Sequence, residues 1–143
     1  MAQAKTDLPN PRSLDVRQRV ILVADDEEMI HQVITILLQG QGYVVLSAFD
    51  GLEALEVSRQ YPGTIDLVIT DVEMPRLNGI ELCLRLLEER PGIKVIVMSG
   101  RTEHENVRQS VNTPFLLKPF RGETLLASVR EMLEPSRHGP NQL

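Results

Sequence analysis

Five short aliphatic segments alternate along the chain with longer segments in which apolar residues recur at helical spacing. The aliphatic segments lie at residues 20–24, 43–46, 67–70, 95–98 and 115–117. Most of them are continuously apolar rather than alternating, which is typical of strands covered on both faces, as in a parallel sheet. The pattern therefore predicts five strands, each followed by a helix.

The intervening segments carry helical faces, helix starts and helix stops. Apolar faces are expected at Ile30, Val33, Ile34 and Leu37, at Ile80, Cys83, Leu84 and Leu87, and at Leu126, Val129 and Leu133. Capping-box spacing occurs at Asp50–Glu53, Asn78–Glu81 and Thr102–Glu105. Repeated βα units with right-handed crossovers predict an α/β fold in which one parallel sheet carries helices on both faces.

The regular alternation occupies residues 19–134, and the residues outside it are expected to be flexible tails. Residues 1–18 are rich in proline with little apolar content, apart from a short helix expected near residues 14–16. Residues 135–143 also offer little to bury. A length of 143 residues leaves room for a single domain between these tails.

Composition excludes several classes of protein. Fifteen Lys and Arg residues against 20 Asp and Glu give a net charge of -5, which disfavours direct binding of nucleic acid. No apolar run approaches the roughly 20 residues that span a bilayer, and the N-terminus lacks the apolar core of a signal peptide. We therefore expect a cytoplasmic protein without a membrane segment. The single cysteine, Cys83, can form neither an internal disulfide nor a four-ligand zinc site.

Polar and charged residues follow four of the five predicted strands. Asp25 and Asp26 end the first strand, Asp71 the third, Ser99 the fourth and Lys118 the fifth. Each is ordinary alone, since acids favour helix N-termini and serine is common in loops. Ligands of open α/β sheets, however, bind at the carboxyl ends of the strands. The combination therefore predicts a site at that edge.

The chemistry of this set favours phosphoryl transfer. Three adjacent carboxylates repel one another unless a cation lies among them, and Mg²⁺ suits hard oxygen ligands with several retained waters. A carboxylate can also act as a nucleophile toward phosphorus. Transfer needs charge neutralisation around the phosphoryl oxygens. The residues with the capacities that these steps require are Asp26, Asp71, Ser99 and Lys118.

Four segments together resemble the receiver domain of two-component response regulators over roughly residues 19–134. They are VILVADDEE, ITDVEMPRLNG, VIVMSG and FLLKPF, in this order and at family-like spacing. Any single segment would be weak support, but the ordered set is highly specific. The resemblance implies a flavodoxin-like (βα)5 three-layer sandwich with strand order 2-1-3-4-5.

The resemblance also implies roles for residues at the predicted site. Asp71 corresponds to the phosphoacceptor, and Ser99 and Lys118 to the residues that bind the phosphoryl group. A cis peptide is expected between Lys118 and Pro119. Phe115 occupies the position of the aromatic switch residue, although it could instead be a plain core residue.

The implied metal is Mg²⁺. Asp26 and Asp71 would bind it directly, Asp25 through water or by shaping the site, and Glu73 through its backbone carbonyl. In this reading the protein is a signalling switch and not an enzyme. A histidine kinase or a histidine phosphotransfer protein would donate the phosphoryl group, and a downstream protein target or a phosphorylation-dependent homodimer would carry the output.

Three alternatives remain beside this interpretation. A receiver-like interaction module that is never phosphorylated would have the same fold and a silent site. Phosphatases with an aspartate nucleophile resemble D-x-D after the first strand, whereas here Asp71-Val72-Glu73 follows the third. A nucleotide binder is disfavoured because no glycine-rich loop follows the first strand.

The chain departs from the family pattern after the fourth strand. Ser99 and Lys118 are 19 residues apart, closer than is common in the family, so a short helix with a poor apolar face is expected from Thr102. The usual Gly-Ala pair before the fifth strand is absent, and residues 110–114 read SVNTP. These features resemble the receivers attached to hybrid histidine kinases.

The resemblance implies that two residues flank the exit of the phosphoryl group, and we predict that they pair across the site. They are Glu73 and Arg101, and their pairing would hinder an attacking water molecule. The three histidines, His31, His104 and His138, are scattered along the chain and are expected at the surface rather than in a phosphorelay role.

Overall fold

A computed structural model describes residues 17–102, 104 and 113–134 of the chain. Its five strands are β1 (Val20–Ala24), β2 (Val44–Ala48), β3 (Leu67–Asp71), β4 (Lys94–Ser99) and β5 (Phe115–Leu117). They form one parallel sheet in the order β2-β1-β3-β4-β5. The predicted flavodoxin-like architecture is therefore confirmed. Most of the two predicted tails, and of the helix expected from Thr102, lies outside the described residues.

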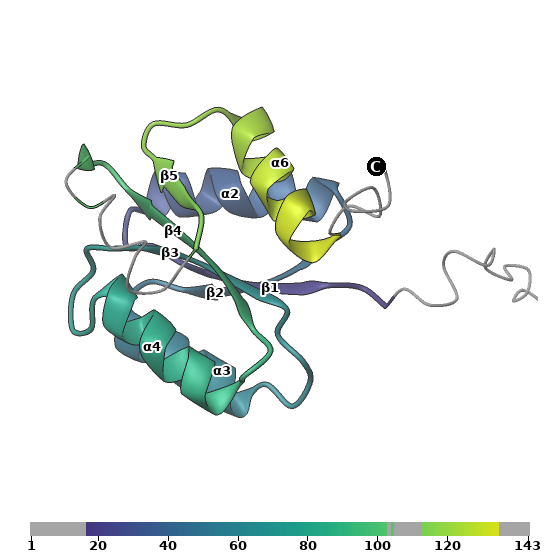
Figure 1. The fold of residues 1–143 in the computed structure, drawn as a ribbon, viewed down its shortest axis with the longest axis vertical. Helices are drawn as coiled ribbons and strands as arrows, with labels where there is room; N and C mark the ends of the chain where they lie inside the picture. Colours follow the sequence, from purple (N-terminus) through teal and green to yellow (C-terminus); the bar gives the residue numbers. More distant parts are fainter. Residues whose placement is uncertain (1–16, 103, 105–112, 135–143) are drawn as a thin grey trace, which may run out of the picture.

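Helices cover both faces of the sheet, which gives three layers (Figure 1). One face carries α2 (Glu28–Gly40) and α6 (Gly122–Leu133), and the other carries α3 (Gly51–Gln60) and α4 (Gly79–Glu89). Since both faces of the sheet are covered, β1 is buried along its whole length. Its successive side chains point to opposite faces and therefore contribute to two hydrophobic clusters. The central strands are continuously apolar for this reason.

Two of the predicted helix caps are present. The Asp50 carboxylate accepts a hydrogen bond of 2.8 Å from the Glu53 backbone N–H at the start of α3. The Asn78 side chain accepts one of 2.9 Å from the Glu81 N–H at the start of α4. Such caps satisfy backbone donors that the first helical turn leaves without partners.

The predicted apolar faces of α2 and α4 were rotated from the real ones. In α2 the buried side chains are His31, Ile34 and Leu38, whereas Val33 is 53% exposed. His31 was expected at the surface, but it is only 4% exposed. These helices contain more apolar residues than one face can bury, so the sequence is compatible with more than one choice of buried face.

The buried face of α4 is rotated from the predicted one in the same way. The buried face of α6 is close to the predicted one. Leu82, Cys83 and Leu86 are buried in α4, whereas Leu84 is 47% exposed. In α6 the buried residues include Val129 and Leu133, as predicted.

Two glycines allow the helices on one face to approach the backbone of the β3–α4 region closely. A Cβ on Gly79 would lie 2.0 Å from the carbonyl oxygen of Asp71, and one on Gly51 would lie 2.1 Å from that of Leu77. No side chain fits at such distances. The Gly79 N–H also donates to the Val72 carbonyl. The start of α4 is therefore held directly against the end of β3, where Asp71 lies.

Candidate functional site

The carboxyl ends of four strands bring the predicted polar residues together at one edge of the sheet. Asp71 and Ser99 are the last residues of β3 and β4, and Asp25 and Lys118 directly follow β1 and β5. Backbone hydrogen bonds join these ends, including one from the Lys118 N–H to the Ser99 carbonyl. The peptide bond between Lys118 and Pro119 is cis, as expected.

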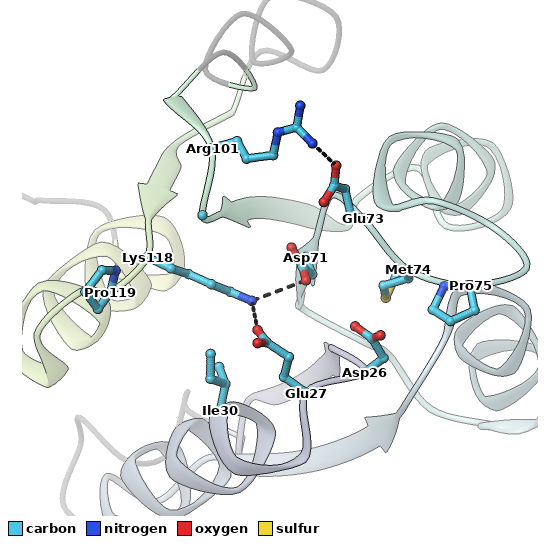
Figure 2. A pocket seen from close by; sticks show the side chains of 11 residues that line it. Asp26, Glu27, Ile30, Asp71, Glu73, Met74, Pro75, Arg101, Lys118 and Pro119 are labelled. Atoms are coloured by element: carbon cyan, nitrogen blue, oxygen red, sulfur yellow. Dashed lines mark hydrogen bonds and ion pairs between the residues drawn. The ribbon is translucent and has the colours of Figure 1, made fainter.

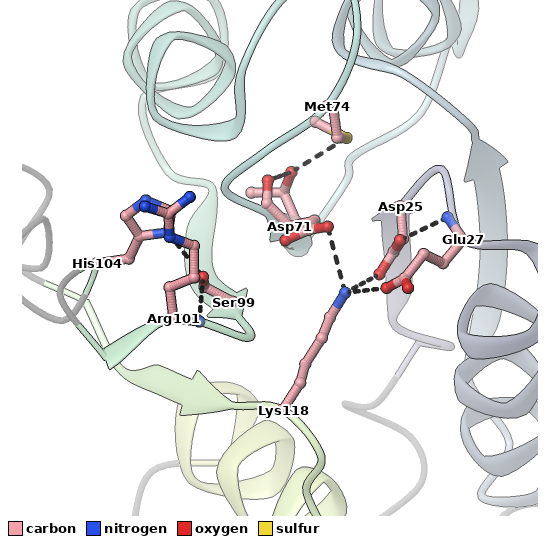
Figure 3. A network of polar contacts seen from close by, with 9 residues as sticks. Asp25, Glu27, Asp71, Met74, Ser99, Arg101, His104 and Lys118 are labelled. Atoms are coloured by element: carbon pink, nitrogen blue, oxygen red, sulfur yellow. Dashed lines mark hydrogen bonds and ion pairs between the residues drawn. The ribbon is translucent and has the colours of Figure 1, made fainter.

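Lys118 lies at the centre of the cluster. Its ammonium nitrogen is 2.8 Å from Glu27, 3.0 Å from Asp25 and 3.2 Å from Asp71, measured to one carboxylate oxygen of each (Figure 3). Asp25 is fully buried, and the Lys118 side chain is only 9% exposed. Such buried charges are stable only when they are paired, so Lys118 is the internal counterion of this acidic edge.

The charges of the cluster shift the ionisation of two of its members. Burial and the nearby Asp25 carboxylate raise the pKa of Asp71, although Lys118 opposes this shift. Burial alone would lower the pKa of Lys118, but its bonds to Glu27 and Asp25 and the charge of Asp71 raise that pKa above its ordinary value. The site therefore favours the charged form of Lys118 and disfavours the ionised form of Asp71.

A cleft of about 750 Å³ opens over Asp71. Asp26 and Glu27 line one side and Glu73 and Arg101 the other, as Figure 2 shows. Oxygen atoms of three carboxylates, those of Asp25, Asp26 and Asp71, lie within 4.8 Å of one another. This set of hard oxygen donors could hold a divalent cation.

Glu73 and Arg101 form the predicted ion pair, which lies at the rim of the cleft. Their side chains are joined by an ion pair of 3.0 Å between an Arg101 nitrogen and a Glu73 oxygen. Both side chains are more than half exposed, so the pair contributes little stability, less than about 1 kcal/mol. Its position at the rim of the cleft is its notable feature.

Ser99 is buried, and its hydroxyl faces away from Lys118 toward the loop that follows β4. The hydroxyl lies 2.7 Å from Nδ1 of His104 and accepts a hydrogen bond of 3.0 Å from the Arg101 N–H. His104 was expected at the surface as an unassigned residue, but its side chain is only 18% exposed. Phe115 is partly buried and packs against the core cluster beneath α3 and α4.

Two residues in contact with the site had no role assigned from the sequence. Glu27 follows the two aspartates directly, so its acidic run was a usable signal for its contact with Lys118. His104 carried no comparable signal, because its contact with Ser99 depends on how the chain turns after β4.

Residues 21–130 match the model of the response regulator receiver domain. The chain is also 37% identical over 117 residues to the sensor kinase CckA of Brucella abortus, covering 80% of this chain and 12% of that protein. It is 30% identical over 133 residues to the DNA-binding response regulator MtrA of Mycolicibacterium smegmatis, covering 91% of this chain and 57% of that protein. The chain thus spans only part of these relatives.

Solved structures of response regulators are also similar to this chain. The chemotaxis response regulator CheY4 of Vibrio cholerae is 30% identical, with a TM-score of 0.73 over 82% of this chain and 100% of that chain. The response regulator TrrA of Thermotoga maritima, solved in complex with Mg²⁺ and BeF, is also 30% identical, with a TM-score of 0.73 over 81% and 100% of the two chains. The chain therefore belongs to the response regulator receiver domain family, whose members are switches in two-component signalling.

We expect Asp71→Asn to increase the free energy of unfolding at neutral pH. Because the folded state raises the pKa of Asp71, the ionised side chain destabilises the native protein. This penalty is absent in acid and develops as the pH rises above about 4 and through the raised pKa. Urea unfolding across the acid-to-neutral range, in a buffer with a metal chelator, measures the difference between the variant and the wild type.

Asp50→Asn is the matched control and should have the opposite sign. Burial opposes the shift, but bonds from the Glu53 N–H and from Arg76 lower the pKa of Asp50 below its ordinary value. Its charge therefore stabilises the folded state above the unfolded pKa, and that contribution is lost as the pH falls. Asparagine keeps the helix cap, so the variant tests the charge of Asp50 together with its ion pair to Arg76. Equal signs for the two variants would contradict this description of the site.

Proposed function

We propose that Asp71 accepts a phosphoryl group from a phosphohistidine on a partner protein, with Mg²⁺ as the metal. The observation that carries the proposal is the placement of Asp71: a buried carboxylate at the base of an open cleft, 3.2 Å from the ammonium group of Lys118. A nucleophile that receives a phosphoryl group needs this combination of access and fixed positive charge.

The metal fits the donor set. Asp25, Asp26 and Asp71 would hold it together with the Glu73 backbone carbonyl, because their carboxylate oxygens lie within 4.8 Å of one another. Lys118 forms ion pairs with Asp25 and Asp71 of this set. When bound, Mg²⁺ supplies positive charge that offsets the charge of the transferring phosphoryl oxygens. It would also relieve the repulsion between Asp25 and Asp71.

The residues of this chain would then divide the transfer among them. An oxygen of Asp71 forms a bond to phosphorus as the phosphorus–nitrogen bond of the donor breaks. The bonding electrons stay on the histidine nitrogen, which leaves as neutral imidazole when the other ring nitrogen carries a proton. Lys118 would move from Glu27 to a phosphoryl oxygen, and Ser99 would donate its hydroxyl to another.

The consequence of phosphorylation is a shift between two conformations. Moving Ser99 and Lys118 onto the phosphoryl group would reposition the end of β4 and the start of β5, where Phe115 is the proposed switch residue. A downstream protein target, or a second copy of the chain, would bind the shifted state preferentially. We place this switch in the cytoplasm and assign it no enzymatic role beyond its own phosphorylation and dephosphorylation. None of the helices in the described ranges has the length and apolar character required to cross a membrane.

The central test uses acetyl phosphate as a small phosphodonor. With Mg²⁺, the intact mass of the wild-type chain should rise by one phosphoryl group. Asp71→Asn should abolish the gain, and omission of Mg²⁺ should reduce it strongly. Asp50→Asn should react like the wild type, because Asp50 caps α3 outside the cleft. If the wild type gains no mass at saturating donor, the chain is a receiver-like interaction module without phosphorylation.

The surface beside the cleft suits a protein donor. Met29, Val33 and Ile36 form an exposed apolar stripe along α2. A shallow apolar pocket lined by Met29 and Val33 shares Lys118 and Pro119 with the cleft over Asp71. Apolar surface at such a position is typical of a protein contact. We therefore assign the stripe to a histidine kinase or a histidine phosphotransfer protein.

Val33→Glu tests this assignment. Since Val33 is exposed, we expect the variant to fold and to react with acetyl phosphate at the wild-type rate. Its phosphorylation by a phosphorylated histidine phosphotransfer protein that serves the wild type should be several-fold slower, because the charge disrupts the apolar contact. The two rates can be compared by following the phosphorylated fraction over time. An unchanged rate with the protein donor would show that the stripe does not contact the partner.

The Glu73–Arg101 pair is proposed to slow the loss of the phosphoryl group. Hydrolysis requires a water molecule to approach phosphorus in line with the bond to Asp71, and the pair stands at the rim of the cleft through which water enters. We expect Glu73→Asn and Arg101→Ala each to increase the rate of dephosphorylation several-fold. The double variant should add little, because either change alone breaks the pair. Unchanged rates in both single variants would remove this role from the pair.

A further inference from the structure

The Ser99 hydroxyl is already engaged in the described conformation. Ser99 is 2% exposed, and its oxygen lies 2.7 Å from His104 Nδ1 and 3.0 Å from the Arg101 backbone nitrogen (Figure 3). A hydroxyl has one proton to donate and two lone pairs to accept with. The Arg101 N–H uses one lone pair, which leaves the proton and one lone pair for the contact with His104, so the tautomer of His104 decides the direction of that bond.

The surroundings of His104 favour the tautomer that accepts this proton. Its other ring nitrogen, Nε2, lies 3.7 Å from a Glu73 carboxylate oxygen. A negative charge at that distance favours a proton on Nε2, which leaves the lone pair of Nδ1 directed at Ser99. In this arrangement Ser99 donates its hydroxyl proton to His104.

A phosphoryl group on Asp71 requires the same proton. Phosphoryl oxygens only accept hydrogen bonds, so Ser99 can stabilise the group only by donating its hydroxyl proton. His104 and the phosphoryl group therefore compete for one donor. Each stabilises a different position of Ser99, which is the condition for biasing a two-state equilibrium.

We propose that His104 is a positioning residue that holds Ser99 in the resting state and so lowers the affinity of the site for a phosphoryl group. This inference rests on the proposed function of Asp71. It assigns His104 a role distinct from that of the acidic residues and Lys118. Loss of His104 should favour the switched state, whereas loss of Ser99, Lys118 or Asp71 should oppose it.

The test measures the affinity of the wild type and variants for beryllium fluoride, a phosphoryl mimic, in the presence of Mg²⁺. We expect His104→Ala to bind it about threefold to tenfold more tightly, which is the equilibrium effect of one released hydrogen bond. His104→Asn should stay near the wild type, because the asparagine oxygen can accept from Ser99 in place of Nδ1. Thermal unfolding of each variant verifies that it is folded.

A double-mutant cycle separates positioning from a general structural effect. In the Ser99→Ala background, His104→Ala should leave the affinity for beryllium fluoride unchanged, because no hydroxyl remains to be held. A second readout is the ¹⁵N chemical shift of His104 Nδ1, which should change on Ser99→Ala in the resting state and on addition of beryllium fluoride to the wild type.

The possible failures are distinguishable. If the wild type gains a phosphoryl group from acetyl phosphate but His104→Ala binds beryllium fluoride no more tightly, only the role of His104 is overturned. The role of His104 is also overturned if His104→Ala still tightens the binding of beryllium fluoride in the Ser99→Ala background. If the wild type neither gains the phosphoryl group nor binds beryllium fluoride, both the proposed function and this inference fail.

Discussion

The buried carboxylate of Asp25 is the constraint on which the site depends. It directly follows β1, an interior strand of the sheet, with no exposure to solvent, and a charge in that position must be matched from within the protein. Lys118 supplies the match from the opposite end of the sequence, 3.0 Å away. This contact joins the end of β1 to the end of β5. The same ammonium group also contacts Asp71 at the end of β3. Fold and site therefore share one electrostatic requirement.

The same requirement supports the proposed response of the site to a phosphoryl group. Lys118 is shared among three carboxylates, and Glu27 is the most exposed of them. A cation shared in this way can move to a new anion without leaving Asp25 unpaired. On the other side of the cleft, Ser99 bonds to His104 and Glu73 to Arg101. Lys118 and Ser99, the two residues proposed to bind the phosphoryl group, thus already have partners. Phosphorylation would act by exchanging these partners for phosphoryl oxygens.

Strand positions were predicted more accurately than helix faces, for a physical reason. The strands of this parallel sheet are short, continuously apolar and bounded by polar residues, so β1 and β5 were predicted with the bounds that the structure shows. The helix α2 instead carries apolar residues around most of its circumference. Its periodicity indicated Val33 as a core residue, whereas packing against the sheet buries His31 and Leu38. The choice among several possible faces is made by the neighbouring elements.

The sequence alone determined the residues of the site and the edge at which they meet. Asp25, Asp71 and Lys118 each follow an apolar strand, and parallel strands carry such residues to the same end of the sheet. Tertiary structure decided which partners these groups choose. The contacts of Lys118 with Glu27 and of Ser99 with His104 join residues from different elements or from a turn. Their distances depend on packing and loop geometry, which no local pattern of residues records.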